Sequence, residues 1–510
     1  MSRLVVVSNR VASPREMKPG GLAVAMLAAL REEGGLWFGW SGSIAPVAAT
    51  AGDEALPLKE ERVGPVEYLT MDLTRKDYDE YYAGFANRTL WPLFHFRPGL
   101  VDFDRQAWAG YLRVNALFAD RLAALLRPTD RVWIHDYHLL PLAAMLRERG
   151  VRARIGFFLH TPLPPLELMR MLPVHRELFG ALACCDLVGF HTESYVRAFH
   201  DYALAELGAE VNERGVYSVE GGRQSFRIAA FPIGVDPLQI AGDARHAVTL
   251  SATRRLQRSM DGKSLVIGVD RLDYSKGLPE RFRAFGRFLS CFPDQQRRVS
   301  LLQIAPSSRG EVPEYRDLRR ELEGISGAIN GRWAEPDWVP LRYVNKAFQP
   351  ATLAGFYRLA RVGLVTPFRD GMNLVAKEYV CAQDPDDPGV LVLSRFAGAA
   401  EELDAAVLVN PYDADGMAQA LHAALLMPLA ERCARWEAMM QVLRRNDIDA
   451  WRRSFLAMLS NGGPATLVLA PGDDGDRDDL SQLQGLPAGA IDERGTANRA
   501  GGGARPPATH

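Results

Sequence analysis

Short runs of apolar residues, many of them β-branched, recur along the chain, and each is followed by a longer segment with the spacing of a helix. Strands that alternate with helices in this way predict parallel sheets with helices on both faces. The runs are residues 4–7, 132–134, 155–159, 187–190, 265–269, 299–304, 362–365 and 390–393. The pattern therefore predicts an α/β fold built from doubly wound sheets.

The predicted strands fall into two groups, separated near residues 231–237 by a stretch that contains two prolines and a glycine. Stretches of this kind commonly link domains. The chain of 510 residues also exceeds the roughly 250–300 residues at which a single core stops growing. We therefore expect two Rossmann-like domains, residues 1–235 and 236–446. Residues 461–510 are rich in Gly, Pro, Asp and Ala, so we expect this tail to be disordered.

Most of the predicted strands end in polar residues. In doubly wound sheets, ligands bind beyond the carboxyl ends of the strands. The polar strand ends are Arg10, His135, Asp136, His160, His191, Arg271, residues 307–309 and Asp370. We expect these side chains to converge on one cleft.

The chain is close to electrically neutral. Its formal net charge of −2 gives no global positive field for nucleic acid or an anionic membrane, so an anionic ligand must be met by local cations. Five scattered cysteines form no C-x-x-C pair, which suits a reducing cytosol. No run approaches the ~18 apolar residues of a transmembrane helix, and no secretion signal is evident. We therefore expect a cytoplasmic protein.

The most informative segment is residues 366–379, which follow the predicted strand 362–365 with polar groups and then a helix start. Gly371 allows the backbone to approach a ligand closely. Hydroxyls or phosphates can bind the N–H groups of a helix N-terminus. These groups belong to Met372, Asn373 and Leu374. Glu378 lies one turn further along, on the same helix face as the first of these helical residues.

This segment resembles the donor-sugar loop of the trehalose-6-phosphate synthase family of glycosyltransferases, and residues 1–460 as a whole resemble that family. Seven further motifs occur in the family's order and at about its spacing. They are LVVVSNR (4–10), GGL (20–22), LWFGW (36–40), WIHDYH (133–138), FLHTP (158–162), DRLDYSKG (270–277) and QIAPSSR (303–309). The resemblance implies the GT-B fold, in which two Rossmann-like domains face a central cleft. It also implies a closing helix, about residues 447–460, that crosses back to the first domain.

The resemblance implies transfer of a glucosyl group from UDP-glucose to the anomeric hydroxyl of glucose 6-phosphate. The products would be α,α-trehalose 6-phosphate and UDP, with retention of configuration. No carboxylate is evidently placed to form a covalent glycosyl-enzyme. The family instead implies a front-face displacement, in which the departing phosphate accepts the proton of the acceptor. UDP-glucose is then a substrate, and no cofactor is expected.

Arg271 and Lys276 follow a predicted strand and flank a turn that ends in Gly277. A diphosphate leaving group gains negative charge as its bond to the sugar breaks, so two fixed cations would stabilise the transition state more than the ground state. The other interpretation is an ordinary surface network in which the two cations pair with Asp270 and Asp273.

Arg10 and Arg309 each follow a strand, in opposite predicted domains. The planar fork of arginine matches a phosphate bidentately. In the resembled family, the two matching positions hold the phosphate of glucose 6-phosphate together with those of Trp40 and Tyr82. Taken alone, each arginine would more simply be solvated at the surface.

The resemblance assigns the remaining site residues to the two sugars and the nucleotide. Asp136 would bind the acceptor glucose, which Trp91 would help to shape, and His160 would bind the donor glucose. Without the resemblance, all three would be read as buried structural residues. Phe348 would contact the uracil ring, and the Glu378 carboxylate would accept hydrogen bonds from two ribose hydroxyls. The other donor-binding positions are Gly20, Gly21, Arg271, Lys276, Asp370, Gly371, Met372, Asn373, Leu374 and Val375.

A tempting metal motif is Asp77-Tyr-Asp79, because paired carboxylates of this form carry a metal in another class of glycosyltransferase. The same spacing recurs at 102–104 and 413–415, which favours solvated helix faces. With Arg271 and Lys276 supplying charge to the diphosphate, no metal is expected.

Two rival functions remain. A different phosphorylated acceptor, such as glycerol phosphate or a cyclitol phosphate, would be expected to change the acceptor residues. A non-catalytic sugar-phosphate sensor would be expected to have lost the charged donor residues. The chain retains both sets. The sequence leaves open the preference for UDP over ADP or GDP donors and whether the protein forms a homo-oligomer.

Overall fold

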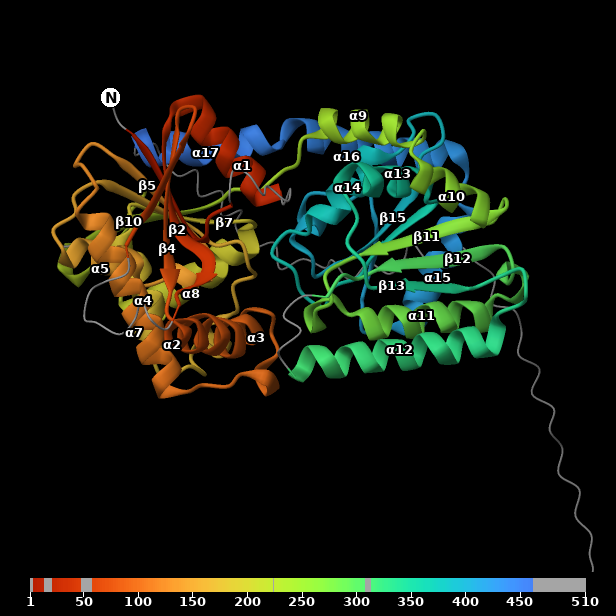
Figure 1. Ribbon diagram of the computed structural model, residues 1–510, viewed down its shortest axis with the longest axis horizontal. Helices are drawn as coiled ribbons and strands as arrows, with labels where there is room; N and C mark the ends of the chain where they lie inside the picture. The colour runs from red at the N-terminus through yellow and green to blue at the C-terminus, as the bar shows by residue number, and fades with distance from the viewer. Residues whose placement is uncertain (1–2, 13–20, 47–56, 223, 308–312, 462–510) are drawn as a thin grey trace, which may run out of the picture. The chain divides into compact units, whose positions relative to one another are not determined.

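The computed structural model describes residues 3–12, 21–46, 57–222, 224–307 and 313–461. The described chain is built around two separate sheets with helices packed against them (Figure 1). The strands of the first sheet end at Ala230, and those of the second begin at Ser264. The predicted α/β architecture with two mainly parallel sheets is confirmed. The predicted domain boundary at 235/236 falls between the two sheets and stays a prediction.

The first sheet has the strand order β3-β4-β2-β1-β5-β6-β7-β10-β9-β8. Its strands are β1 Leu4–Arg10, β2 Gly35–Ile44, β3 Lys59–Val63, β4 Val66–Leu73, β5 Arg131–His135, β6 Arg154–Phe158, β7 Leu187–Phe190, β8 Glu210–Val211, β9 Val216–Val219 and β10 Gln224–Ala230. The central neighbours pair in parallel, and the short outer strands at both edges pair antiparallel.

The second sheet has the order β13-β12-β11-β14-β15-β16, and all its pairs are parallel. Its strands are β11 Ser264–Val269, β12 Val299–Ile304, β13 Leu341–Val344, β14 Val362–Val365, β15 Val390–Ser394 and β16 Val407–Val409. On β11, Val266 packs into one hydrophobic cluster and its neighbours Leu265 and Ile267 pack into another. Because successive side chains point to opposite faces, this sheet is covered on both sides.

Helices connect these strands. They are α1 Gly21–Glu33, α2 Arg75–Asp77, α3 Trp91–Phe94, α4 Arg105–Ala123, α5 Leu142–Glu148, α6 Leu166–Met169, α7 His175–Gly180, α8 Glu193–Leu207, α9 Pro237–Ala247, α10 Ser251–Met260, α11 Leu278–Cys291, α12 Pro313–Trp333, α13 Pro350–Leu359, α14 Leu374–Ala382, α15 Ala414–Leu426, α16 Leu429–Arg445 and α17 Ile448–Asn461. A π-helix, η2 (Tyr78–Leu90), runs directly into α3. Such i→i+5 segments are rare and are frequent at functional sites. None of the helices that the structure describes is both long and apolar enough to span a bilayer.

The last helix, α17, returns to the first sheet and lies beside α1 (Figure 1). Its Phe455 stacks on Trp133 with ring centroids 4.8 Å apart. An ideal Cβ on Gly156 of β6 would lie 2.8 Å from the Phe455 ring, so the glycine makes room for this aromatic side chain. The helix therefore adds a buried face to the first sheet, although it follows the second sheet in sequence.

The repeated Asp-x-Asp pattern was interpreted as solvated helix faces, and that interpretation is wrong for three of the carboxylates. Asp77 is 8% exposed and pairs with Arg113 at 2.6 Å. Asp104 caps α4 by accepting from the N–H of Ala107, and Asp413 caps α15 in the same way. A carboxylate before a helix accepts otherwise unpaired N–H groups, which is a structural use of the residue.

Candidate functional site

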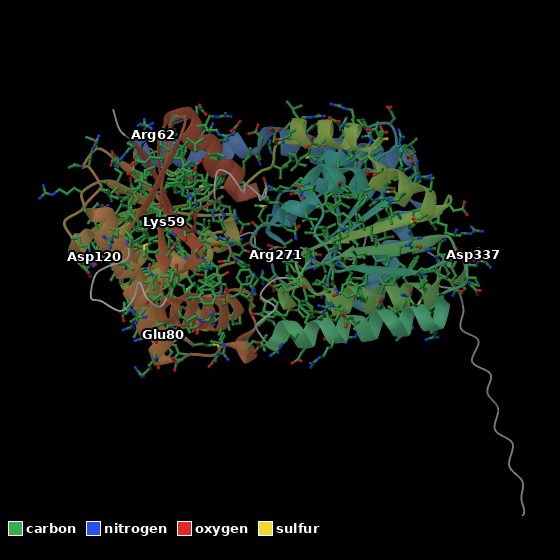
Figure 2. All side chains as sticks on the ribbon, viewed as in Figure 1. Lys59, Arg62, Glu80, Asp120, Arg271 and Asp337 are labelled. Carbon is green, nitrogen blue, oxygen red and sulfur yellow. The ribbon has the colours of Figure 1, made fainter. Side chains whose placement is uncertain are left out.

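A cavity of about 310 Å³ lies where polar strand ends from both sheets meet. Figure 2 places Arg271 between the two halves of the described chain. The predicted site residues that line the cavity are Tyr82, Trp91, Asp136, His160, Arg271, Lys276, Asp370 and Gly371. The cavity is also lined by Asn9, His95, Tyr137, His138, Thr161 and Pro162. The expected convergence of strand ends is therefore present.

Lys276 and Asp370 form an ion pair at the floor of this cavity. The Lys276 Nζ donates to Asp370 Oδ2 at 2.5 Å, and Asn373 Nδ2 donates to the same oxygen at 2.9 Å. Burial acts to raise the pKa of Asp370, but the charge and hydrogen bond of Lys276 hold it below its ordinary value. The carboxylate therefore stays ionised and fixes the direction of the lysine.

Arg271 is exposed to the cavity, with its guanidinium carbon 5.7 Å from the centroid of the Trp91 ring. The surface network that the sequence allowed is not formed by its expected acids. Asp270 pairs instead with the fully buried Arg281, and Asp273 accepts from Ser275 and Tyr315. Arg271 thus presents its charge to the same space that Lys276 borders.

Asp136 follows β5 in a backbone conformation that is uncommon for a side chain with a Cβ, with φ at 74°. Its Oδ1 accepts from the N–H of His160 at 3.2 Å. Burial raises the pKa of Asp136 to about 6, although backbone donors and the Arg271 charge act to lower it. Strained, buried polar groups of this kind cluster at functional sites.

Three histidines lie at the ends of neighbouring strands. His135 Nδ1 lies 3.0 Å from His160 Nε2, and the rings of His160 and His191 are 5.4 Å apart. Burial lowers the pKa of all three, that of His191 to about 3. They are therefore neutral near pH 7, and a neutral imidazole can both donate to and accept from a sugar hydroxyl.

On the side of the first sheet, three of the predicted acceptor residues lie close together. Arg10 is the register partner of Trp40 on the neighbouring strand β2, and the Trp40 and Tyr82 rings are 5.5 Å apart. The Arg10 guanidinium lies over Gly42, where an ideal Cβ would be 2.5 Å from its Nε. Tyr82 and Trp91 border the cavity, whereas Arg10 and Trp40 lie behind Tyr82.

The N-terminus of α14 faces this cavity through the loop that precedes it. Asn373 has φ at 78° and caps the helix by accepting from the N–H of Ala376 at 3.0 Å. An ideal Cβ on Gly371 would lie 2.1 Å from the carbonyl oxygen of His160. Gly371 lines the cavity, but the atoms that require a glycine here belong to the protein's own backbone. Met372 is buried, and Leu374 and Val375 are half-buried in the first turn.

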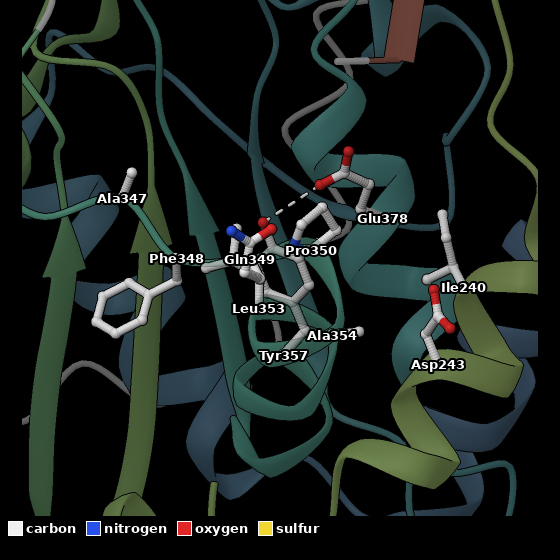
Figure 3. A pocket seen from close by; sticks show the side chains of 10 residues that line it. All are labelled: Ile240, Asp243, Ala347, Phe348, Gln349, Pro350, Leu353, Ala354, Tyr357 and Glu378. Atoms are coloured by element: carbon white, nitrogen blue, oxygen red, sulfur yellow. Dashed lines mark hydrogen bonds between the residues drawn. The ribbon is translucent and has the colours of Figure 1, made fainter. Parts of the chain in front are cut away.

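A second pocket, of about 390 Å³, contains Phe348 and Glu378 (Figure 3). The Tyr357 hydroxyl donates to Glu378 Oε2 at 3.3 Å. Burial raises the pKa of Glu378 to about 7. In Figure 3 the Phe348 ring points away from Glu378, and it packs edge-on against Phe356. The pocket is lined by carboxylates, amides and apolar groups but by no cation, so it suits an uncharged ligand part.

Two predicted site residues, Gly20 and Arg309, lie outside the described residues, and Gly21 is the first residue of α1. The sequence interpretation missed His95, which is buried in the cavity wall with its Nδ1 2.8 Å from the Trp91 carbonyl oxygen. A carbonyl only accepts, so Nδ1 carries the hydrogen and Nε2 is an acceptor. The available signal was the four-residue spacing from Trp91, which places both side chains on one helix face.

Within the part of the chain that the structure describes, no group of three or more His, Cys, Asp or Glu side chains has the arrangement of a metal site. The positive charge at the cavity comes from Arg271 and Lys276.

Comparison with known proteins links this geometry to one family. The model of glycosyltransferase family 20 matches residues 4–461. A trehalose-6-phosphate synthase of Klebsiella pneumoniae is 50% identical over 466 residues, which cover 91% of this chain and 96% of the relative.

Two solved structures are similar throughout the described chain. One is a UDP-forming α,α-trehalose-phosphate synthase from Burkholderia xenovorans in complex with glucose 6-phosphate, with 50% identity, a TM-score of 0.85 and coverage of 90% and 100% of the two chains. The other is an E. coli protein described as trehalose-6-phosphate bound with UDP-2-fluoro glucose, with 48% identity, a TM-score of 0.85 and coverage of 90% and 99%.

Proposed function

Because this chain belongs to glycosyltransferase family 20, we propose that its cavity carries out the reaction for which its relatives are named. The protein is a glucosyltransferase that moves glucose from UDP-glucose to glucose 6-phosphate and forms α,α-trehalose 6-phosphate and UDP. The observation that carries this assignment is the cavity between the two sheets, in which cations from one half face aromatic and carboxylate groups from the other.

The leaving diphosphate is assigned to Arg271 and Lys276. As the bond from the anomeric carbon to the phosphate oxygen breaks, negative charge grows on that oxygen, and the two cations stabilise it. Asp370 keeps Lys276 in place, and the N–H groups of Met372 to Val375 at the start of α14 add partial positive charge. Gly20 and Gly21 are proposed to contact the same diphosphate.

The acceptor is assigned to the side of the first sheet. Arg10 and Arg309 bind the phosphate of glucose 6-phosphate, and Trp40 and Tyr82 form the wall beside it. Asp136 binds hydroxyls of the acceptor glucose, and Trp91 shapes its pocket. Support comes from the 5.5 Å contact between Trp40 and Tyr82 and from the place of Arg10 next to Trp40.

The donor is assigned to the side of the second sheet. His160, neutral because it is buried, hydrogen-bonds the donor glucose, and the uncharged pocket of Phe348 and Glu378 holds the nucleoside. Glu378 accepts from the ribose hydroxyls. These assignments place the anomeric carbon between the acceptor hydroxyl and the leaving phosphate on one face, so the phosphate oxygen takes the acceptor proton and configuration is retained.

We also propose that the reaction needs no metal cofactor, because Arg271 and Lys276 neutralise the diphosphate. The cytosol is the proposed location, since all five cysteines are free and disulfides are rare there.

Product analysis tests the function directly. The purified protein is incubated with UDP-, ADP- and GDP-glucose in combination with glucose 6-phosphate, glycerol phosphate and a cyclitol phosphate. We expect trehalose 6-phosphate and UDP as the main products. A preference for glycerol phosphate or the cyclitol phosphate would replace the acceptor assignment, and no product with any pair would favour a sensor.

A further inference from the structure

Two stretches of chain join the half that carries the first sheet to the half that carries the second. One is residues 231–236, between β10 and α9, and the other is residues 446–447, between α16 and α17. The two connections touch, because the N–H of Ile448 donates to the Val235 carbonyl oxygen at 3.0 Å. An ideal Cβ on Gly234 would lie 2.2 Å from the carbonyl oxygen of Asn446, so only a glycine fits at this crossing.

A buried ion pair ties both connections to helix α14. Lys377 has no exposed surface, and its Nζ donates to the carbonyl oxygen of Ile233 in the first connection at 2.7 Å. The same Nζ pairs with Glu402 Oε2 at 2.5 Å. Glu402 Oε1 in turn accepts from Nδ2 of Asn446 in the second connection at 2.8 Å. One lysine and one glutamate therefore hold both crossings.

The position of Lys377 on α14 gives this pair a link to the donor site. The N-terminus of the helix is capped by Asn373, which also contacts Asp370, and the next residue after Lys377 is Glu378 in the nucleoside pocket. Burying two charges costs free energy that an apolar pair of similar volume would not. The location of the charges on the two connections therefore points to a role other than stability alone.

We propose that Lys377 is a positioning residue that couples occupation of the donor site to the placement of the acceptor site. The inference rests on the proposed function, because it takes the donor to bind at α14 and the acceptor to bind on the first sheet. A nucleotide bound at α14 fixes the helix. Through Lys377 and Glu402, the helix then fixes both connections and with them the strand ends that carry Asp136 and Arg10.

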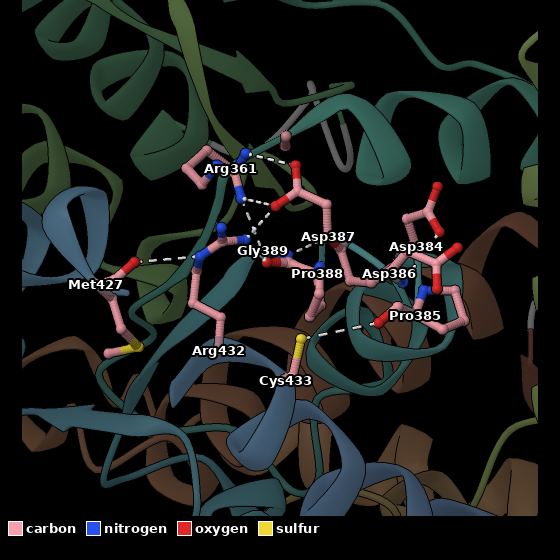
Figure 4. Close-up of polar contacts among 12 residues, drawn as sticks. Arg361, Asp384, Pro385, Asp386, Asp387, Pro388, Gly389, Met427, Arg432 and Cys433 are labelled. Atoms are coloured by element: carbon pink, nitrogen blue, oxygen red, sulfur yellow. Dashed lines mark hydrogen bonds and ion pairs between the residues drawn. The ribbon is translucent and has the colours of Figure 1, made fainter. Parts of the chain in front are cut away.

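The chain offers a matched control at the other end of the same helix. In the loop after α14, Asp387 pairs with Arg361 at 2.9 Å and with Arg432 of α16 at 2.7 Å (Figure 4). Arg432 is 9% exposed and also donates to the Met427 carbonyl oxygen. These groups form an ion network in the same half of the protein, but their printed partners lie in neither connection.

The test measures how strongly two non-reacting ligands help each other to bind. The dissociation constant of UDP is determined by calorimetry without and with saturating glucose 6-phosphate, and the ratio of the two values is the coupling factor. Allosteric coupling is typically about 5- to 150-fold. Lys377→Met, Glu402→Gln and Asn446→Ala are compared with the wild type and with Arg432→Met, and thermal unfolding is recorded for each.

We expect all three connection variants to bring the coupling factor toward one, while UDP alone binds nearly as in the wild type. Arg432→Met should keep the wild-type factor even where its melting temperature falls as far. Asn446→Ala removes a single neutral hydrogen bond, so this comparison stands even if Lys377→Met does not fold.

Three outcomes would overturn the inference: a wild-type factor of one, connection variants with the wild-type factor, or an equal loss in Arg432→Met. Failure of the wild type to bind UDP or glucose 6-phosphate at all would instead overturn the proposed function.

Discussion

At the scale of single residues, Arg10 carries the most specific claim about the acceptor. A charge-assisted bidentate contact contributes roughly 1.5–3 kcal/mol, and ~1.4 kcal/mol corresponds to a tenfold change in affinity. We therefore expect Arg10→Ala to raise the KM for glucose 6-phosphate by about one to two decades and to change the KM for UDP-glucose little. Initial-rate kinetics with each substrate varied in turn measures both.

Arg62→Ala is the control for that variant, because Arg62 is an exposed arginine of β3 in the same sheet. Unphosphorylated glucose offers the guanidinium nothing, so it should be a poor acceptor for the wild type and should lose little more with Arg10→Ala. An equal loss of turnover with both acceptors would remove Arg10 from the phosphate site.

Glu378 predicts a pH dependence of donor binding. Burial raises its pKa from 4.5 to about 7, so below pH 7 the carboxyl group is mostly protonated in the free protein. Ribose hydroxyls donate to the ionised form, and donor binding therefore favours loss of the proton. UDP should bind more tightly as pH rises through 7 and more weakly as pH falls through it. Glu378→Gln should bind weakly and without this step, whereas a step of equal size in the variant would assign the titration to another group.

Sequence reasoning reached many site residues but few of their contacts. Arg271 and Lys276 stand out because they follow a strand, yet the partner of Lys276 is Asp370, which is 94 residues away. The backbone strain of Asp136 leaves no mark on the sequence, because it results from the hydrogen bonds of its loop. His95 was missed since one histidine in an apolar segment looks like any core residue.

At the scale of elements, the loop before α14 depends on the absence of a side chain at Gly371. A methyl group there would meet the His160 carbonyl oxygen at 2.1 Å, so Gly371→Ala must push the loop and its Asp370 away from β6. We expect kcat to fall by at least about tenfold, since displacements near 1 Å in an active site can cost about a hundredfold. Gly324→Ala is the control, because its Cβ would meet nothing within 4 Å on helix α12. Wild-type kcat in Gly371→Ala would contradict the close approach.

The eight strands predicted from apolar runs are all present, and each observed boundary lies within three residues of the prediction. These strands are continuous apolar runs because they are buried on both faces. The prediction omitted β2 and β4, in which glycine, serine and charged residues interrupt the apolar pattern, and the exposed hairpin strand β3. Strands β13 and β16 are only four and three residues long, too short for a clear period.

At the scale of the whole molecule, the charge at the cleft is supplied by the chain itself. Lys276 is balanced by Asp370, and Arg271 adds a further positive charge beside Trp91. We therefore expect turnover to survive excess chelator, measured as UDP release before and after treatment. Loss of activity that magnesium or manganese restores would return attention to the paired aspartates, of which Asp79 is half-exposed.

The last described helix separates the part of the chain that the fold needs from the part that it does not. The end of α17 is held by Arg131, which donates to the Ser460 hydroxyl at 3.2 Å, and by Arg154, which donates to the Leu459 carbonyl oxygen at 3.3 Å. Beyond Ser460, a composition rich in Gly, Pro, Asp and Ala cannot bury enough apolar surface to offset the entropy of ordering. Truncation after Ser460 should therefore leave turnover and melting temperature nearly unchanged.

Truncation after Asp447 provides the contrast, because it also removes α17. Trp133 and Phe158 would then lose Trp451 and Phe455, which lie 4.8 to 5.7 Å from them between ring centroids. Loss of one buried aromatic side chain costs about 3–5 kcal/mol, a large part of the ~5–15 kcal/mol that stabilises a typical domain. This shorter chain should be unfolded or insoluble. A large loss of turnover on removal of only the residues after Ser460 would show instead that the tail docks on the protein and takes part in its activity.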